Sequence, residues 1–70
     1  RTAHESKVGY VAATDFIKKQ AAKDAELLAT KQVDEVVWHF FRSADTQKIG
    51  PSAPLKKLLE DYGIKVVIYE

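Results

Sequence analysis

Glu5 and Lys7 are the residues whose types and spacing most suggest chemistry. They stand two positions apart in a segment with strand-like alternation, which places both charged groups on one face of a sheet. In a functional site, the Glu5 carboxylate and the backbone carbonyl of Ser6 bind Mg²⁺ or Mn²⁺. The Lys7 ammonium then orients an attacking water or stabilises charge developing at a phosphate. The alternative is a solvated ion pair on an edge strand, worth about 0.2–1 kcal/mol.

Gln20 and Asp24 are two polar residues in the apolar stripe of a predicted helix, which Thr14 caps and which runs from Asp15 to about Thr30. The expected apolar stripe consists of Phe16, Ile17, Ala21, Ala25, Leu27 and Leu28. Because this helix directly follows the strand, its inner face brings Gln20 near the end of the strand that carries Glu5 and Lys7. The alternative is that Gln20 and Asp24 are boundary residues whose polar ends reach water.

The other elements follow from periodicity and from capping residues. The segment Ala3–Val11 predicts a strand, in which Gly9 indicates a bulge or a close backbone approach. Val36–Phe41 is apolar on both faces, as in a central strand covered on both sides. Ser43–Pro51 is predicted to be a loop, after which Ser52 caps a second helix and Gly63 ends it. The apolar stripe of that helix is Leu55, Leu58, Leu59 and Tyr62, and Ile64–Tyr69 is the last strand.

The order strand, helix, strand, helix, strand predicts an α/β fold, β-α-β-α-β, with a small mixed or parallel sheet and two helices. Seventy residues make one small domain, and the absence of cysteine excludes disulfides and thiolate sites. No segment is long and apolar enough for a membrane span. Eleven Lys and Arg against ten Asp and Glu require that any nucleic-acid surface arise from local segregation of charge.

Several further residues have both a functional and a structural interpretation. His39 is a possible base or ligand, although a histidine in an apolar strand is more often a core residue. Trp38, Phe40 and Phe41 are expected in the core. Basic residues that could form a phosphate-binding rim, or equally ordinary solvated faces, are Lys18, Lys19, Lys23, Lys31, Arg42 and Lys48.

These motifs together resemble the PD-(D/E)xK, or restriction-endonuclease-like, nuclease superfamily. The closest resemblance is to the C-terminal nuclease domains of bacterial polymorphic toxins of the contact-dependent-inhibition and Rhs types. The resemblance covers nearly the whole chain, and its order of elements is more specific than any one motif. The motifs that carry it are Glu5-Ser6-Lys7-Val8-Gly9-Tyr10-Val11, Gln20-x-x-x-Asp24, Val36–Phe41, Gly50-Pro51-Ser52 and Gly63–Ile68.

The resemblance implies that Glu5 is a metal ligand, Lys7 a catalytic residue and Gln20 an active-site polar residue. Asp24 and His39 are possible accessory residues. The superfamily also has an acidic ligand on a strand before the one that carries Glu-x-Lys. Only Arg1–His4 precede Glu5 here, so that half of the site is absent from the sequence. Residues 1–70 are therefore expected to be a single partial domain, the C-terminal half of such a nuclease, with little activity alone. A missing N-terminal segment or a second copy is expected to complete the sheet.

The resemblance also implies a biological setting. It predicts a secreted bacterial effector that cleaves DNA or tRNA in the target-cell cytoplasm and is neutralised by a cognate immunity protein. Two alternatives remain. One is a non-catalytic module that binds a partner protein or self-associates through its sheet edges. The other is a metal-free ribonuclease that depends on His39.

Overall fold

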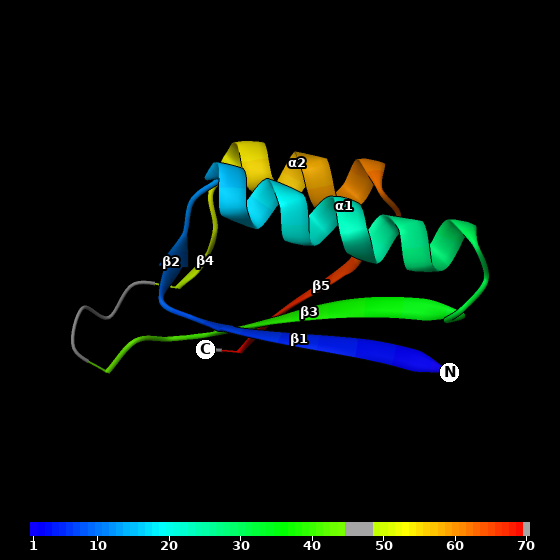
Figure 1. Ribbon diagram of the computed structural model, residues 1–70. Coiled ribbons are helices and arrows are strands. Elements are labelled where there is room, and N and C mark those ends of the chain that lie inside the picture. The colour runs from blue at the N-terminus through cyan, green and yellow to red at the C-terminus, as the bar shows by residue number, and fades with distance from the viewer. Residues whose placement is uncertain (45–48, 70) are drawn as a thin grey trace.

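The computed structural model describes residues 1–44 and 49–69, and it is a small α/β fold (Figure 1). The strands are β1 (Thr2–Val8), β2 (Tyr10–Val11), β3 (Glu35–Phe41), β4 (Gly50–Pro51) and β5 (Lys65–Tyr69), and the helices are α1 (Asp15–Ala29) and α2 (Ala53–Asp61). The main sheet has the order β1-β3-β5, and both strand pairs are parallel. The predicted fold class is confirmed.

Local sequence signals define both helices. The Thr14 hydroxyl caps α1 by accepting a hydrogen bond from the Ile17 amide at 3.3 Å. The Ser52 hydroxyl caps α2 in the same way, accepting from the Leu55 amide at 3.3 Å. The chain leaves α2 through Gly63, whose φ of 77° lies in the left-handed region that glycine adopts without strain. The predicted caps are therefore correct.

The hydrophobic core lies between the main sheet and the two helices, which both cover the same face of it (Figure 1). Its fully or nearly fully buried members are Ala21, Val36, Trp38, Phe40, Leu55, Leu59 and Ile64. Val36, Trp38 and Phe40 alternate along β3, so all three point towards the helices. His39 and Phe41 point from the opposite face.

Two predictions about β3 need correction. β3 is the central strand, but within residues 1–44 and 49–69 helices cover only one face of it. Phe41 was expected in the core, yet its side chain lies on the uncovered face and is 38% exposed. The apolar character of both strand faces therefore does not by itself identify two covering layers.

The predicted strand Ala3–Val11 is divided at Gly9 into β1 and β2. Gly9 has a φ of 82°, and its amide donates to the Phe41 carbonyl at 2.8 Å. Beyond this turn, β2 pairs with β4 in a separate two-stranded parallel sheet, so the predicted loop Ser43–Pro51 contains a short strand. Lys48 lies outside the described residues.

The apolar stripe of α1 is narrower than predicted. Ala21 is buried, and Ile17 and Leu28 pack against the core, but Phe16 is 67% exposed. Phe16 lies one turn before Gln20, on the flank of α1 towards β1. β1 is one of the two edge strands of the main sheet, so among the described residues no neighbouring strand lies beyond it to cover this flank.

Truncating a buried apolar side chain should lower the stability more than truncating an exposed one. Leu59→Ala should lower the free energy of unfolding by about 2–5 kcal/mol, because it leaves a cavity in the core. Phe16→Ala should change it by less than about 1 kcal/mol, because an exposed ring has little packing to lose. Urea denaturation followed by circular dichroism measures both, and equal losses would contradict the assignment of the core.

Candidate functional site

The side chains of Glu5, Lys7 and Gln20 meet between β1 and α1. The Lys7 ammonium donates to Gln20 Oε1 at 2.6 Å and forms an ion pair with Glu5 Oε1 at 3.3 Å. It also lies 5.4 Å from the centroid of the Trp38 ring, within range of a cation–π interaction. The Lys7 side chain is only 15% exposed and that of Glu5 is 35% exposed. The pair is therefore not the fully solvated ion pair of the structural alternative.

Strand alternation and sheet register explain this arrangement. Glu5 and Lys7 point towards the helices, and β3 places Trp38 beside Glu5 and Phe40 beside Lys7. Gln20 lies on the following helix, which packs over the same face. The predicted proximity of Gln20 to the strand of Glu5 and Lys7 is confirmed by their hydrogen bond.

Asp24 contacts Trp38 rather than Lys7. Its Oδ2 accepts a hydrogen bond from Trp38 Nε1 at 2.9 Å. A buried indole N–H needs such an acceptor, and Trp38 is 0% exposed, so this contact accounts for Asp24 in the apolar stripe. Trp38 was expected in the core and is buried there, but the position of its ring beside Lys7 was not expected. Glu5 and Lys7 are two residues apart in β1, and the inward-facing Trp38 and Phe40 are two residues apart in β3. This shared spacing is the signal in the sequence for the contact.

His39 lies on the other face of the main sheet. The alternation along β3 separates it from Trp38 and Phe40, and its ring nitrogens bond to His4 and Tyr69 instead. Its predicted role as an accessory residue for Glu5 and Lys7 therefore has no support in the geometry. The Ser6 side chain is exposed on that face too, while the Ser6 backbone joins Glu5 to Lys7 in β1.

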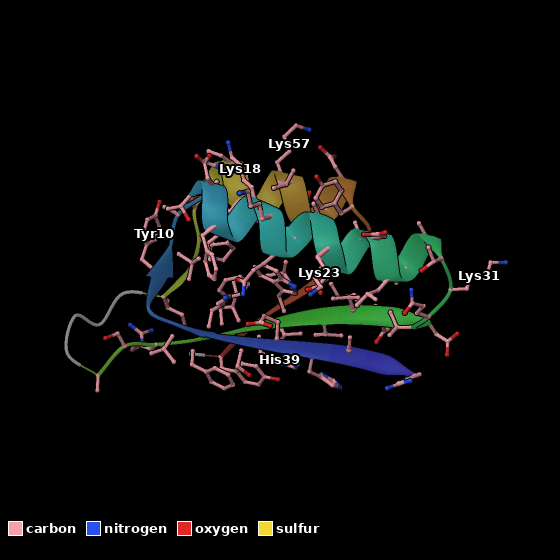
Figure 2. The ribbon with its side chains drawn as sticks, viewed as in Figure 1. Tyr10, Lys18, Lys23, Lys31, His39 and Lys57 are labelled. Carbon is pink, nitrogen blue, oxygen red and sulfur yellow. The ribbon has the colours of Figure 1, made fainter. Side chains whose placement is uncertain are left out.

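The three lysines of α1 are all exposed, but they differ in position. At about 100° per residue, Lys23 lies about 60° around the helix from Gln20, whereas Lys18 lies nearly opposite. Figure 2 shows Lys18 on the side of α1 away from the sheet and Lys23 on the side towards it. Lys31 is at the far end, beyond α1 (Figure 2). Of these described lysines, Lys23 thus lies on the side of α1 nearest to Gln20.

The metal-binding capacity of the site is limited. Among residues 1–44 and 49–69, no group of three or more His, Asp or Glu side chains is positioned to hold a metal ion. Mg²⁺ in phosphate-processing sites is commonly held by one or two carboxylates together with waters and substrate phosphates. Glu5 supplies one carboxylate. The carboxylate of Asp24 is bonded to the Trp38 indole instead. The residues present fit a magnesium site that needs additional ligands.

Two other features bear on binding. A surface hollow of about 290 Å³ lies near the start of β1 and the end of α1, lined by Arg1, Thr2, Ala3, Leu27, Gln32 and Val33. None of the residues that surround Lys7 lines it.

Within the part of the chain that the structure covers, neither helix is long and apolar enough to cross a membrane.

Comparison with known proteins finds no match to a protein-family model, to a curated protein or to a solved structure. Evidence on the function therefore comes from the residues and their geometry.

Removing both charges of the pair separates a functional role from a structural one. The double variant Glu5→Val/Lys7→Met should keep the free energy of unfolding within about 1 kcal/mol of the original or raise it, because replacing a largely buried ion pair with apolar residues is often neutral or stabilising. Lys7→Met alone should lower it by about 1–3 kcal/mol, because Glu5 and Gln20 then lose their shared partner. Urea denaturation measures both. A loss above about 2 kcal/mol in the double variant would show that the pair serves the fold.

Proposed function

We propose that this chain carries the Glu-x-Lys part of a metal-dependent nuclease that hydrolyses phosphodiester bonds in DNA or tRNA. The observation that carries the proposal is the position of the Lys7 ammonium, which Gln20 from α1 and Glu5 from β1 hold in place. The Lys7 side chain is only 15% exposed there. An edge strand that needed only solubility would not require a glutamine on the helix to hold a lysine at its inner face.

The three residues have distinct roles in this proposal. Lys7 donates hydrogen bonds to a non-bridging phosphate oxygen or to the attacking water, and its positive charge stabilises charge that develops at the phosphate. Gln20 Oε1 fixes the position of Lys7 Nζ. Glu5, with the Ser6 carbonyl, holds Mg²⁺ or Mn²⁺, which when bound supplies a Lewis acid for the phosphate and lowers the pKa of a bound water. Lys23 lies where it can contact the nucleic-acid backbone.

The sequence resemblance supports the wider setting. We infer that residues 1–70 are the C-terminal part of a nuclease domain of a secreted bacterial toxin. Such a toxin acts in the cytoplasm of the target cell and is neutralised by an immunity protein. A further carboxylate, from residues upstream of Arg1 or from a second copy, completes the metal site in this proposal.

Divalent-dependent cleavage tests the proposal. The 70-residue chain should cleave plasmid DNA and tRNA weakly or not at all in Mg²⁺. The chain extended by the residues encoded upstream of Arg1 should cleave one of them. In the extended chain, Lys7→Ala and Glu5→Ala should each lower the cleavage rate by at least about 100-fold, since each removes a group that acts on the transition state. Gel assays of substrate decay measure the rates.

The matched control is Lys57→Ala, which removes an exposed lysine of α2 paired with Asp61 and should leave the rate unchanged (Figure 2). Cleavage retained by Lys7→Ala would contradict the proposal, as would the absence of cleavage by the extended chain. Cleavage that persists in a chelator and is lost in His39→Ala would favour the metal-free ribonuclease.

The uncovered sheet face supports a second candidate, self-association of this chain as a non-catalytic interaction module. Parallel sheets are normally covered on both faces, and this face exposes Val8, Phe41, Val67 and Tyr69. A second copy presents the same face, and the apolar and aromatic side chains of two such faces can pack in an isologous pair. Light scattering with and without Mg²⁺ distinguishes the candidates. A dimer whose mass is indifferent to Mg²⁺, dissociated by Phe41→Glu, favours the module, whereas a monomer that binds Mg²⁺ favours the nuclease.

A further inference from the structure

Two histidines and a tyrosine form a hydrogen-bonded row on the uncovered face of the main sheet. His4 Nδ1 lies 2.8 Å from His39 Nε2, and His39 Nδ1 lies 2.8 Å from the Tyr69 hydroxyl. The residues come from β1, β3 and β5, so the row crosses all three strands. Figure 2 shows His39 on the side of the sheet away from the helices. The row is separate from Glu5 and Lys7, which point from the opposite face.

The bonding pattern defines which nitrogens can bind a cation. Tyr69 can accept a hydrogen bond from His39 Nδ1–H, which leaves the lone pair of His39 on Nε2, directed at His4. The His4 Nδ1–His39 Nε2 contact holds one proton between two nitrogens. Both nitrogens can act as ligands once that proton is carried by His4 Nε2 instead, which is the other tautomer of the neutral ring. A histidine whose second nitrogen donates to an oxygen is the usual arrangement at metal sites, because the bond fixes the tautomer and the ring orientation.

The two nitrogens lie close enough together to bind one ion. Metal–imidazole bonds of about 2.0–2.1 Å at a right angle separate two ligand nitrogens by about 2.9 Å, and a tetrahedral angle separates them by about 3.4 Å. The observed 2.8 Å is the length of an N–H···N hydrogen bond, so the two nitrogens lie close enough for a rotation of the rings to bring them to adjacent positions around one ion. Cu²⁺ and Ni²⁺ prefer nitrogen ligands at such positions in a square-planar or tetragonal site. The rings must turn about χ2 to direct both lone pairs at one ion, a torsion with a broad energy well.

The surroundings favour an ion that prefers nitrogen ligands. By the register of the sheet, Glu35 is the one carboxylate on this face of β1, β3 and β5, and it is already paired with Lys65 at 2.7 Å. Hard cations such as Mg²⁺ need oxygen ligands, which the row offers only through the Tyr69 hydroxyl. His4 is exposed and His39 is half-buried, so a cation can reach both rings.

We propose that His4 and His39 form a binding site for a late first-row divalent cation, Cu²⁺ or Ni²⁺, with Tyr69 positioning His39. The two imidazoles occupy adjacent coordination positions, and water or a ligand from a bound molecule fills the others. This site is independent of the proposed nuclease function, because it uses other residues, the other sheet face and another class of metal.

Titration of the untagged chain with CuCl₂ and NiCl₂ tests this site. Isothermal calorimetry should show one site per chain with affinity in the order Cu²⁺ > Ni²⁺ > Zn²⁺ and no heat from Mg²⁺. Electron paramagnetic resonance of the Cu²⁺ complex should show nitrogen ligands in a tetragonal field. His4→Gln and His39→Gln should each weaken Cu²⁺ binding by at least about 100-fold, and Tyr69→Phe, which removes only the orienting hydroxyl, by about 10-fold.

Ser6→Ala, on the same face of β1, and Lys57→Ala, on α2, are the controls and should bind Cu²⁺ as the original chain does. Circular dichroism confirms that each variant is folded. Cu²⁺ binding that is unchanged in both folded histidine variants would overturn the site, as would a spectrum without nitrogen coupling. A preference for Zn²⁺ over Cu²⁺ would overturn the square-planar assignment. None of these outcomes depends on cleavage of nucleic acid.

Discussion

A single turn of α1 makes the two polar contacts on which the site depends. Asp24 accepts from the buried Trp38 indole at 2.9 Å, and Gln20, one turn earlier, accepts from Lys7 at 2.6 Å. The first contact sets the position of α1 along β3, because the indole N–H is costly to leave without a partner. With the helix in that position, Gln20 lies over β1 and can reach Lys7. The position of Lys7 Nζ therefore follows from a hydrogen bond that does not involve Lys7.

Patterns local to one element were predictable from the sequence, while contacts between elements were less so. Capping at Thr14 and Ser52 and the end of α2 at Gly63 depend on neighbouring residues, and they were correct. The proximity of Gln20 to Lys7 followed from chain order. The role of Trp38 depended on sheet register, and the exposure of Phe41 depended on which face the helices cover. Neither property is encoded in a single segment. The split at Gly9 required a positive φ that strand periodicity does not reveal.

The uncovered face is the least usual feature of the fold. A parallel sheet normally has apolar strands because helices lie on both sides. Here β3 has that composition, but within the described part of the chain helices lie on one side only. Its other face is occupied by stacked rings, with His39 and Phe41 each packed against Tyr69 at centroid distances of 5.6 and 4.6 Å. Ring stacking and hydrogen bonds across the strands thus replace part of the burial that a covering layer would supply.

The alternation of β1 separates two kinds of chemistry by one residue. Glu5 and Lys7 point towards the helices, where a carboxylate and an ammonium suit a phosphate and a hard cation. His4 points the other way, where imidazole nitrogens suit a softer cation. Since a shift of one residue in register would exchange the faces, the pairing of β1 with β3 specifies both arrangements together. The two proposed sites take different classes of ion, so in these proposals occupancy of one face does not compete with occupancy of the other.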